Sequence, residues 1–479
     1  MAGSAFKPIK FGTDGWRGII AEDYTFDNVR ACAQGVAAYL HACGLAERGL
    51  VVGYDTRFAS EEFAIAVAEV AAGNGVQVYL ADSAAPTPAI SYHVIHRKAA
   101  GAVVITASHN SPQWNGFKYK PDYAGSASPE VIAELERRIA EAQTTGAINR
   151  TDLSRAEADG QVTRVDVTTP YLEQIERLVD LKSLRAAPLK IVVDSMHGAG
   201  AGLFTRLLGG GRAEVTELRA ERNPAFPGME QPEPISRNLQ GLSAALRASD
   251  ADVGLATDGD ADRLGVIDEQ GRFVTQLQTL ALLALYFLDV RGDRGALVKS
   301  ITTTSMLFKL GKLYGVPVFE TPVGFKHLGP VMMRENALIA GEESGGYGFR
   351  GHIPERDGIL SGLYILAMMV ELKKRPAELI EYLYSKVGPH HYDRIDLTFQ
   401  PDRRQAILAR LEDGTPPTLA GSRVTEVDTL DGFRFHMEDG SWSLIRFSGT
   451  EPLLRIYAET SSPDQVRQLL ADTRELTGV

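Results

Sequence analysis

The amino-acid sequence predicts an α/β protein with several domains, and three observations support this prediction. The chain has 479 residues, more than one hydrophobic core normally supports, so three or four domains are expected. Apolar, β-branched segments of buried-strand length alternate three times with stretches of helical period, as in βαβ units with mainly parallel sheets. Residues 386–479 lack this alternation and instead indicate a C-terminal domain of the α+β type.

Each of the three α/β blocks contains three candidate strands, with helices expected between them. Such strands are short and rich in Val, Ile and Leu because both of their faces are covered. The candidate strands are residues 50–54, 76–80 and 101–106 in the first block, 189–193, 213–218 and 252–256 in the second, and 296–299, 316–319 and 337–340 in the third.

The C-terminal block begins with an alternating strand at residues 395–399, followed by a helix at residues 404–411. Two Asp-Gly dipeptides, in Leu430-Asp431-Gly432-Phe433 and Glu438-Asp439-Gly440-Ser441, predict hairpin turns, and a last helix follows Ser462. Helices expected to join or buttress domains are residues 129–143 and 359–372, and the predicted domains span residues 1–155, 156–272, 273–385 and 386–479.

Composition and charge argue against several classes of protein. The net charge of −11, without a basic run, disfavours a nucleic-acid-binding surface, although a pocket for an anionic substrate depends on the few groups that line it. The longest apolar run, residues 280–288, is about half of the roughly 18 residues that span a bilayer. The N-terminal residues lack the pattern of a secretory signal, so a cytoplasmic protein is expected. Cys32 and Cys43 lie roughly 16 Å apart on one predicted helix and are expected to be reduced.

Polar motifs follow the last strand of each α/β block. Ser108-His109-Asn110 follows the first block's strand, Asp258-Gly259-Asp260-Ala261-Asp262 the second's, and Gly341-Glu342-Glu343-Ser344 the third's. In open α/β sheets, ligands bind at the carboxyl ends of the strands. Three domains therefore each place one polar loop where a binding site is expected.

The aspartate loop suits a hard divalent cation. Asp258, Asp260 and Asp262 alternate in a loop held open by glycine, so their oxygens can converge on one ion, for which Mg²⁺ is the natural choice. An EF-hand is disfavoured because its sixth position requires glycine and is Arg263 here, even though Glu269 occupies the twelfth. A solvated acidic turn is the remaining alternative, but three adjacent carboxylates repel one another without a cation.

Ser108 is a candidate nucleophile. It has no Gly-x-Ser-x-Gly elbow of an α/β-hydrolase, and a turn or N-cap serine is the plain alternative. A serine that carries a phosphoryl group needs a cation and hydrogen-bond donors around the phosphate, and the aspartate loop would supply the cation. Lys118 follows ten residues later and, if desolvated beside other cations, has a pKa lowered enough to accept a proton; a surface lysine is the alternative.

Two further motifs suit phosphate and sugar groups. The segment Arg446-Phe447-Ser448-Gly449-Thr450-Glu451, with Arg455, combines backbone N–H groups, hydroxyls and arginine forks that suit a phosphate dianion, although an ordinary hairpin loop is possible. The segment 341–346 offers carboxylates and a hydroxyl to sugar hydroxyls, with glycines that permit close approach. Arg356, shortly afterwards, is another possible phosphate ligand.

These motifs, together with Thr13-Asp14-Gly15-Trp16-Arg17-Gly18, resemble those of the α-D-phosphohexomutase superfamily and occur in the family's order, over nearly the whole chain. The resemblance implies four domains around a central cleft and a phosphoserine mechanism with a hexose 1,6-bisphosphate intermediate and activator. It implies that Ser108 carries the phosphoryl group and that Lys118 is the general base. Mg²⁺ would be bound by Ser108, Asp258, Asp260 and Asp262, and the residues beside the phosphoryl group would be His109, Arg263 and Arg17. The sugar would be contacted by Glu342, Ser344 and Lys326, and the second phosphate by Arg356, Arg446, Ser448, Gly449, Thr450 and Arg455.

The identity of the sugar depends on smaller differences within the resemblance. Glu342-Glu343-Ser344 is similar to phosphoglucomutases, and Gly346 replaces the histidine that dual-specific phosphomannomutases carry. Against this, Thr321-Pro322-Val323-Gly324 differs from the glucomutase pattern, and the segment 446–452 is closer to phosphoglucosamine mutases, whose sugar loop usually has Gln. We expect a glucose phosphate substrate, with mannose or glucosamine phosphate, bisphosphate synthesis, or an inactive sugar-phosphate-binding protein as alternatives. A monomer or weak homo-oligomer is expected.

Overall fold

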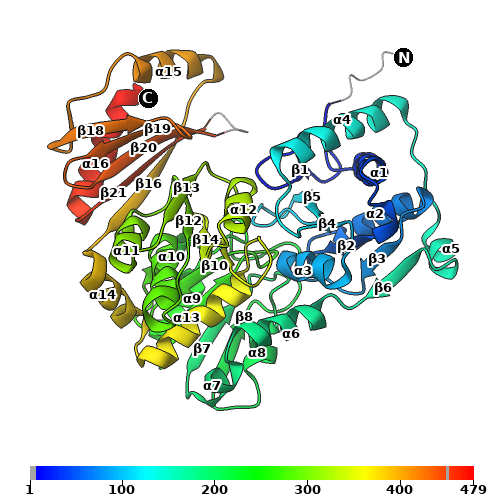
Figure 1. The fold of residues 1–479 in the computed structure, drawn as a ribbon, viewed down its shortest axis with the longest axis horizontal. Helices are drawn as coiled ribbons and strands as arrows, with labels where there is room; N and C mark the ends of the chain where they lie inside the picture. The colour runs from blue at the N-terminus through cyan, green and yellow to red at the C-terminus, as the bar shows by residue number, and fades with distance from the viewer. Residues whose placement is uncertain (1–6, 449–452) are drawn as a thin grey trace.

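The computed structural model describes residues 7–448 and 453–479. Four sheets follow one another along the chain, and we name the domains I to IV after them. The domains form an arc in which domains I and IV occupy the two ends (Figure 1). The predicted fold, three α/β domains with mixed sheets and a different C-terminal domain, is confirmed. No helix within the described ranges is long and apolar enough to cross a membrane.

Domain I contains a six-stranded sheet in the order β1-β5-β4-β2-β3-β6. Strands β4, β2, β3 and β6 are parallel, whereas β5 is antiparallel to both β4 and β1. The elements are β1 (Trp16–Ile19), α1 (Phe26–Ala42), β2 (Leu50–Tyr54), α2 (Ser60–Gly73), β3 (Val78–Ala81), α3 (Thr87–Arg97), β4 (Gly101–Ile105), β5 (Trp114–Pro121), α4 (Pro129–Thr145), α5 (Leu153–Ala158) and β6 (Val162–Val165).

Two features of this sheet differ from the sequence analysis. Strand β5 was not predicted, because Asn, Gly and Lys interrupt its apolar residues, yet its alternation places Lys118 and Lys120 on one face and Phe117 and Tyr119 on the other. Strand β6 pairs with β3 although it follows the predicted boundary at residue 155, so the sheet of domain I includes chain that we had assigned to domain II.

Domains II and III repeat the α/β pattern with smaller sheets. Their orders are β11-β10-β9-β7-β8 and β13-β12-β14-β15, each with a parallel centre and antiparallel strands at one edge. The elements are α6 (Thr168–Leu178), α7 (Leu181–Ala186), β7 (Lys190–Asp194), α8 (Leu203–Leu208), β8 (Glu214–Leu218), α9 (Gln240–Arg247), β9 (Val253–Thr257), β10 (Leu264–Ile267) and β11 (Phe273–Val274), then α10 (Gln276–Leu285), β12 (Leu297–Ser300), α11 (Met306–Tyr314), β13 (Val318–Thr321), α12 (Phe325–Arg334), β14 (Ile339–Gly341), β15 (Tyr347–Phe349), α13 (Gly358–Leu372) and α14 (Pro376–Val387).

Domain IV has a fully antiparallel sheet in the order β16-β21-β20-β19-β18-β17. Both predicted hairpins are present, because β19 pairs with β18 on one side and with β20 on the other. The elements are β16 (His391–Thr398), α15 (Arg404–Glu412), β17 (Thr418–Leu419), β18 (Ser422–Asp428), β19 (Phe433–Met437), β20 (Trp442–Phe447), β21 (Leu453–Thr460) and α16 (Pro463–Thr477).

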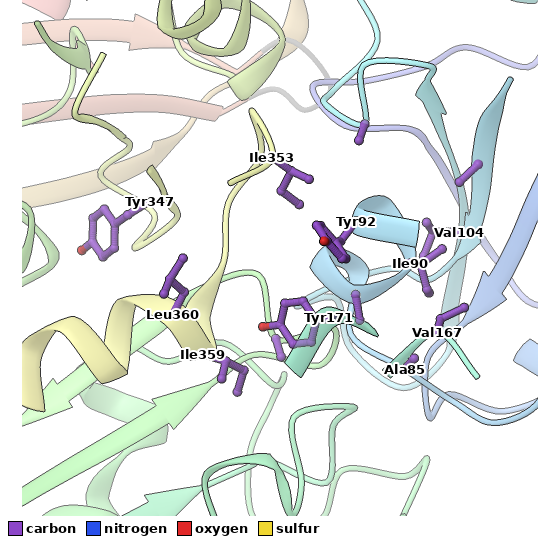
Figure 2. Close-up of a cluster of buried hydrophobic side chains, with 14 of the residues drawn as sticks. Ala85, Ile90, Tyr92, Val104, Val167, Tyr171, Tyr347, Ile353, Ile359 and Leu360 are labelled. Carbon is purple, nitrogen blue, oxygen red and sulfur yellow. The ribbon is translucent and has the colours of Figure 1, made fainter. Parts of the chain in front are cut away.

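One continuous apolar core runs through domains I to III, whereas domain IV has a core of its own and a small second cluster that it shares with Ile301 of domain III. Figure 2 shows the junction, where Tyr92 of α3, Tyr171 of α6 and Leu360 of α13 belong to one cluster. The ring of Tyr92 also stacks on His352, with centroids 5.8 Å apart. The first three domains therefore share an apolar cluster at their junction.

Helix α4, which we expected to join or buttress domains, buttresses domain I by packing on α1. The helix begins at its N-cap Ser128, whose Oγ accepts a hydrogen bond from the amide of Val131, and ends at Gly146 in the left-handed region. It crosses α1 closely at Gly35, where a Cβ atom would lie 2.5 Å from Cγ1 of Ile139. A side chain at this position would push the two helices apart.

This contact predicts that Gly35→Ala destabilises the protein. The added methyl group overpacks the α1–α4 crossing, which costs about 1–3 kcal/mol and outweighs the better helix propensity of alanine. Gly241→Ala on α9 is the matched control, because nothing lies within 4 Å of its Cβ position. Calorimetric melting of both variants measures the effect, and a Gly35→Ala protein as stable as the control would contradict the assigned packing.

Candidate active site

The polar loops after three strands meet at the junction of domains I, II and III. Ser108 follows β4, and its Oγ donates a hydrogen bond to Oδ2 of Asp258, which follows β9, at 2.9 Å. Glu342 follows β14 and contacts Arg356 at 3.5 Å, and Arg356 in turn contacts Asp262 at 2.9 Å. The expectation that these loops form one site is therefore supported by direct contacts between the domains.

The backbone holds Ser108 in an unusual conformation. Its φ of 51° lies in the left-handed region, which non-glycine residues rarely adopt, and its amide donates to Oγ1 of Thr106 at 2.8 Å. The carbonyl of Ser108 approaches Gly259 so closely that a Cβ there would lie 2.5 Å from the oxygen. Such strain persists only where the surroundings enforce it, and it is common at functional sites.

Arg57 enforces this conformation, and the sequence analysis did not identify it. The side chain is fully buried and lies at the end of β2, the same edge of the sheet that carries Ser108. That position after a buried strand is the signal that could have revealed it. Its guanidinium donates to four backbone carbonyls, those of Ser108 at 2.7 Å, Asn110 at 2.5 Å, and Ser111 and Trp114 at 3.1 Å each.

Two residues expected beside the phosphoryl group, His109 and Arg17, lie close to Ser108 and to Asn110, respectively. The ring of His109 is 3.3 Å from Oγ of Ser108, and burial together with Arg263, Arg17 and Arg57 holds the pKa of His109 well below its usual value, so the ring is neutral. Burial and the charge of Arg263 also lower the pKa of Arg17, which donates to the side chain of Asn110 at 2.5 Å. This surplus of positive charge suits a phosphoryl group on the serine.

The three aspartates fit a divalent cation. All are buried, and one carboxylate oxygen from each lies within 4.8 Å of the others. Oδ1 of Asp260 and Oδ1 of Asp262 have no hydrogen-bond partner although they are buried, which is costly for a carboxylate. Burial and the charges of Asp260 and Asp262 raise the pKa of Asp258 well above its usual value. An oxygen-liganded cation such as Mg²⁺ would satisfy the orphaned oxygens and relieve this repulsion.

The surroundings of Lys118 differ from the prediction. We expected cationic neighbours and a lowered pKa, but its ammonium group lies 2.8 Å from Asp14, 2.8 Å from Asp260 and 3.3 Å from Asp262. Burial alone would lower the pKa of Lys118, yet these three carboxylates outweigh it and raise the pKa. The three carboxylates therefore favour the ammonium form of Lys118, the opposite of the expected effect.

Further buried charges, which the sequence analysis did not assign to the site, extend this network into domain III. Asp14, inside the first motif, contacts Lys118, Lys120 at 3.0 Å and Arg356 at 2.5 Å. Lys120 also contacts Glu355 at 2.5 Å. Asp14 lies in the same motif as Arg17, and Glu355 directly precedes Arg356. Their position beside these two predicted site residues is the signal that could have revealed them.

The predicted sugar ligands lie in domain III. Oε1 of Glu342 accepts a hydrogen bond from the amide of Gly324 at 2.9 Å, and burial raises the pKa of Glu342. Ser344 is partly buried two residues later in the same loop. Lys326 extends toward domain I, where it donates to the carbonyl of Gly12 at 3.5 Å. Glu342 and Lys326 thus offer a carboxylate and an ammonium group to a ligand, and Glu342 contacts Arg356 of the buried charge network.

The predicted phosphate ligands of domain IV lie apart from this cluster. Arg446 donates from Nε to Oδ2 of Asp431 at 2.9 Å, and Arg455 lies 3.7 Å from Asp396. Within residues 7–448 and 453–479, no hydrogen bond or ion pair joins either arginine to Ser108 or the aspartate loop. The amide of Ser448 donates to the carbonyl of Leu453 at 2.8 Å, and the predicted ligands Gly449 and Thr450 lie outside the described residues.

Comparisons with known proteins agree with this arrangement. Four family models, described as phosphoglucomutase/phosphomannomutase α/β/α domains I, II and III and C-terminal domain, match residues 8–146, 169–271, 276–387 and 402–476. A phosphoglucomutase/phosphomannomutase of Thermococcus kodakarensis is 33% identical over 463 residues, which are 96% of each chain. A probable phosphoglucosamine mutase of Methanothermobacter thermautotrophicus is also 33% identical, over 98% of this chain and 97% of its own.

A solved structure supports the same assignment. The putative phosphomannomutase from Thermus thermophilus superposes with a TM-score of 0.85 at 37% identity and covers 99% of this chain and 100% of its own. The fold and the clustered motifs define a phosphohexomutase, an enzyme of the isomerase class. The chain belongs to the phosphoglucomutase/phosphomannomutase family.

The aspartate cluster predicts opposite effects of one substitution with and without metal. Asp258→Asn removes one of three mutually repelling charges, so the metal-free variant should melt at a higher temperature than the wild type. Mg²⁺ at about 100 times its dissociation constant should stabilise the wild type by about 2.7 kcal/mol and the variant much less.

Thermal melts in EDTA and in Mg²⁺ measure both effects. Asp250→Asn, on the exposed surface of domain II, is the control and should keep the full response to Mg²⁺. Equal Mg²⁺ shifts for Asp258→Asn and wild type would contradict a cation site at these aspartates.

Proposed function

We propose that the protein interconverts glucose 1-phosphate and glucose 6-phosphate through a phosphorylated Ser108 and a hexose 1,6-bisphosphate. The observation that carries the proposal is the position of Ser108: its Oγ lies 2.9 Å from Oδ2 of Asp258 in the aspartate cluster of domain II, and the buried guanidinium of Arg57 contacts its carbonyl. A serine in this position can carry a phosphoryl group whose charge is compensated on both sides.

In the proposed reaction, a sugar hydroxyl attacks the phosphorus of phosphoserine, the bond from phosphorus to Oγ breaks, and a bisphosphate forms. The bisphosphate turns around, Oγ attacks its other phosphate, and the bond from that phosphorus to the second sugar oxygen breaks. This oxygen takes up the proton that the attacking hydroxyl released in the first transfer. Asp258, Asp260 and Asp262 would hold Mg²⁺, which supplies charge compensation for the phosphoryl group. Arg17, Arg57 and Arg263 add fixed positive charge around the reacting oxygens, and neutral His109 can donate a hydrogen bond.

Lys118 is our candidate for the proton acceptor of the sugar hydroxyl. Its ammonium group is bound to carboxylates, so the role requires that another cation take up the charge of Asp260 and Asp262. Glu342 and Ser344 would hold the sugar, with Lys326 and Arg356 beside them. Arg446, Ser448 and Arg455 would bind the phosphate that is not transferred, together with Gly449 and Thr450.

Glucose is the proposed sugar because of the loop that follows β14. Glu342-Glu343-Ser344 resembles the phosphoglucomutase pattern, and Gly346 stands where the dual-specific pattern has histidine. The second candidate is glucosamine phosphate, which is favoured by the segment 446–452 and by the name of the Methanothermobacter relative. The name of the Thermus structure favours mannose.

A substrate panel tests the choice of sugar. Turnover of glucose 1-phosphate, mannose 1-phosphate and glucosamine 6-phosphate should be measured with Mg²⁺, each with and without the matching bisphosphate. We expect the highest kcat/KM with glucose 1-phosphate and stimulation by glucose 1,6-bisphosphate. Activity with the amino sugar alone would overturn the choice of glucose, and accumulation of free bisphosphate would identify a synthase instead.

Ser108→Ala tests the phosphoserine mechanism and excludes a protein that merely binds sugar phosphates. The variant lacks the oxygen that accepts the phosphoryl group, so we expect turnover to fall by about 10⁴-fold or more while hexose phosphate still binds. Intact-mass measurement should find a phosphoryl group on the wild type treated with bisphosphate and none on the variant. Full turnover by Ser108→Ala would refute the mechanism.

A further inference from the structure

The Asp-Gly turn between β18 and β19 contains an aspartate with contacts outside its turn. Oδ2 of Asp431 accepts a hydrogen bond from Nε of Arg446 on β20 at 2.9 Å. The same oxygen accepts a second bond from the backbone amide of Val323 at 2.9 Å. Val323 belongs to domain III, in the loop after β13, so one carboxylate oxygen joins two domains.

The contact continues to the predicted sugar ligand through the next peptide group. The amide of Gly324 donates to Oε1 of Glu342 at 2.9 Å. Gly324 has a φ of 119°, a region that favours glycine, so consecutive amides can serve two different carboxylates here. Arg446, Asp431, the loop at 323–324 and Glu342 thus form a continuous series of hydrogen bonds between domain IV and the sugar loop.

A second contact ties the sugar loop to domain IV from its other side. Oε1 of Glu343 accepts hydrogen bonds from the hydroxyl of Tyr392 and from Nη1 of Arg394, both on β16, at 3.0 Å each. Glu343 lies between the two predicted sugar ligands of this loop, Glu342 and Ser344. Domain IV therefore contacts the sugar loop directly through Glu343 and indirectly through Asp431 and the loop at 323–324. Asp431 also contacts a predicted phosphate ligand, Arg446. Other contacts, such as Arg434 with Glu320, join domains III and IV elsewhere.

We propose that Asp431 is a positioning residue that sets the orientation of Arg446 and couples the phosphate-binding domain to the sugar-binding carboxylate Glu342. The proposal rests on the proposed function, since that function gives Arg446 and Glu342 their ligands. A hexose phosphate has a fixed spacing between its phosphate and its sugar hydroxyls. To bind the phosphate and the sugar hydroxyls at the same time, Arg446 and Glu342 must be held at a matching separation. Asp431 contributes to that separation by contacting Arg446 and the loop that binds Glu342.

The other Asp-Gly turn of the domain provides a matched control. Oδ1 of Asp439, between β19 and β20, accepts a hydrogen bond from the amide of Ser441 at 2.9 Å, a contact inside its own turn. The two turns have the same sequence signal and lie at the two ends of β19. A role limited to shaping a hairpin would give the same result for both aspartates.

The test compares Asp431→Asn with Asp439→Asn in the full-length protein. Asparagine keeps the size of the side chain but removes the charge and one of the two equivalent oxygens. We expect Asp431→Asn to raise the KM for glucose 1-phosphate and for glucose 6-phosphate by about tenfold with little change in kcat, because binding is weakened equally in the ground and transition states. Asp439→Asn should leave both constants unchanged.

A second readout does not depend on activity. Hydrogen exchange of the Val323 amide should be faster in Asp431→Asn than in wild type and unchanged in Asp439→Asn, since the first variant weakens its acceptor. A raised KM together with faster exchange supports the coupling. Unchanged exchange at Val323, or an equal KM in the two variants, would overturn it.

Failure of the proposed function gives a different result. In that case wild type turns over none of the three hexose phosphates, and the exchange rate at Val323 alone decides whether Asp431 couples the domains. If Asp431→Asn is poorly folded, Asp431→Ser replaces it with the same two measurements.

Discussion

Arg356 joins the first three domains through buried ion pairs. Its guanidinium, carried by domain III, contacts Asp14 of domain I at 2.5 Å and Asp262 of domain II at 2.9 Å. Lys118 and Lys120 face the same carboxylates from β5. All of these groups are nearly excluded from water, where an uncompensated charge costs roughly 3–5 kcal/mol, so each side chain requires its partners on the other domains.

The same requirement shapes the chemistry of the site. Around Ser108 the buried side chains are mainly cations, whereas a few ångströms away three carboxylates crowd together with two orphaned oxygens. Lys118 and Arg356 pair with two of these carboxylates, but the two orphaned oxygens remain. A phosphoryl group beside the cations and a divalent cation beside the carboxylates would complement both groups of charges. Because water is excluded, these fixed charges act at short range without screening, which is the condition for strong stabilisation of transferred charge.

Much of this site could be predicted from the sequence, because Ser108, Asp258 and Glu342 each follow an apolar strand and the carboxyl ends of such strands face ligands. What could not be predicted depends on contacts between distant segments. Arg57 is ordinary in sequence and acquires its role only when four carbonyls surround it. Lys118 was expected beside cations, but a strand with polar residues placed it among aspartates instead, and an apparently local turn aspartate, Asp431, proved to reach another domain.

The shared core of domains I to III has a consequence for the newly made chain. Tyr92 of domain I stacks on His352 and lies in one apolar cluster with Leu360, residues that the ribosome adds far later (Figure 2). Until that segment emerges, the apolar face of the first domain has no partner, and such exposed surface makes a nascent chain prone to aggregation. Domain IV differs, because its main core lies within itself and its second cluster packs on Ile301 of domain III, which is synthesised earlier.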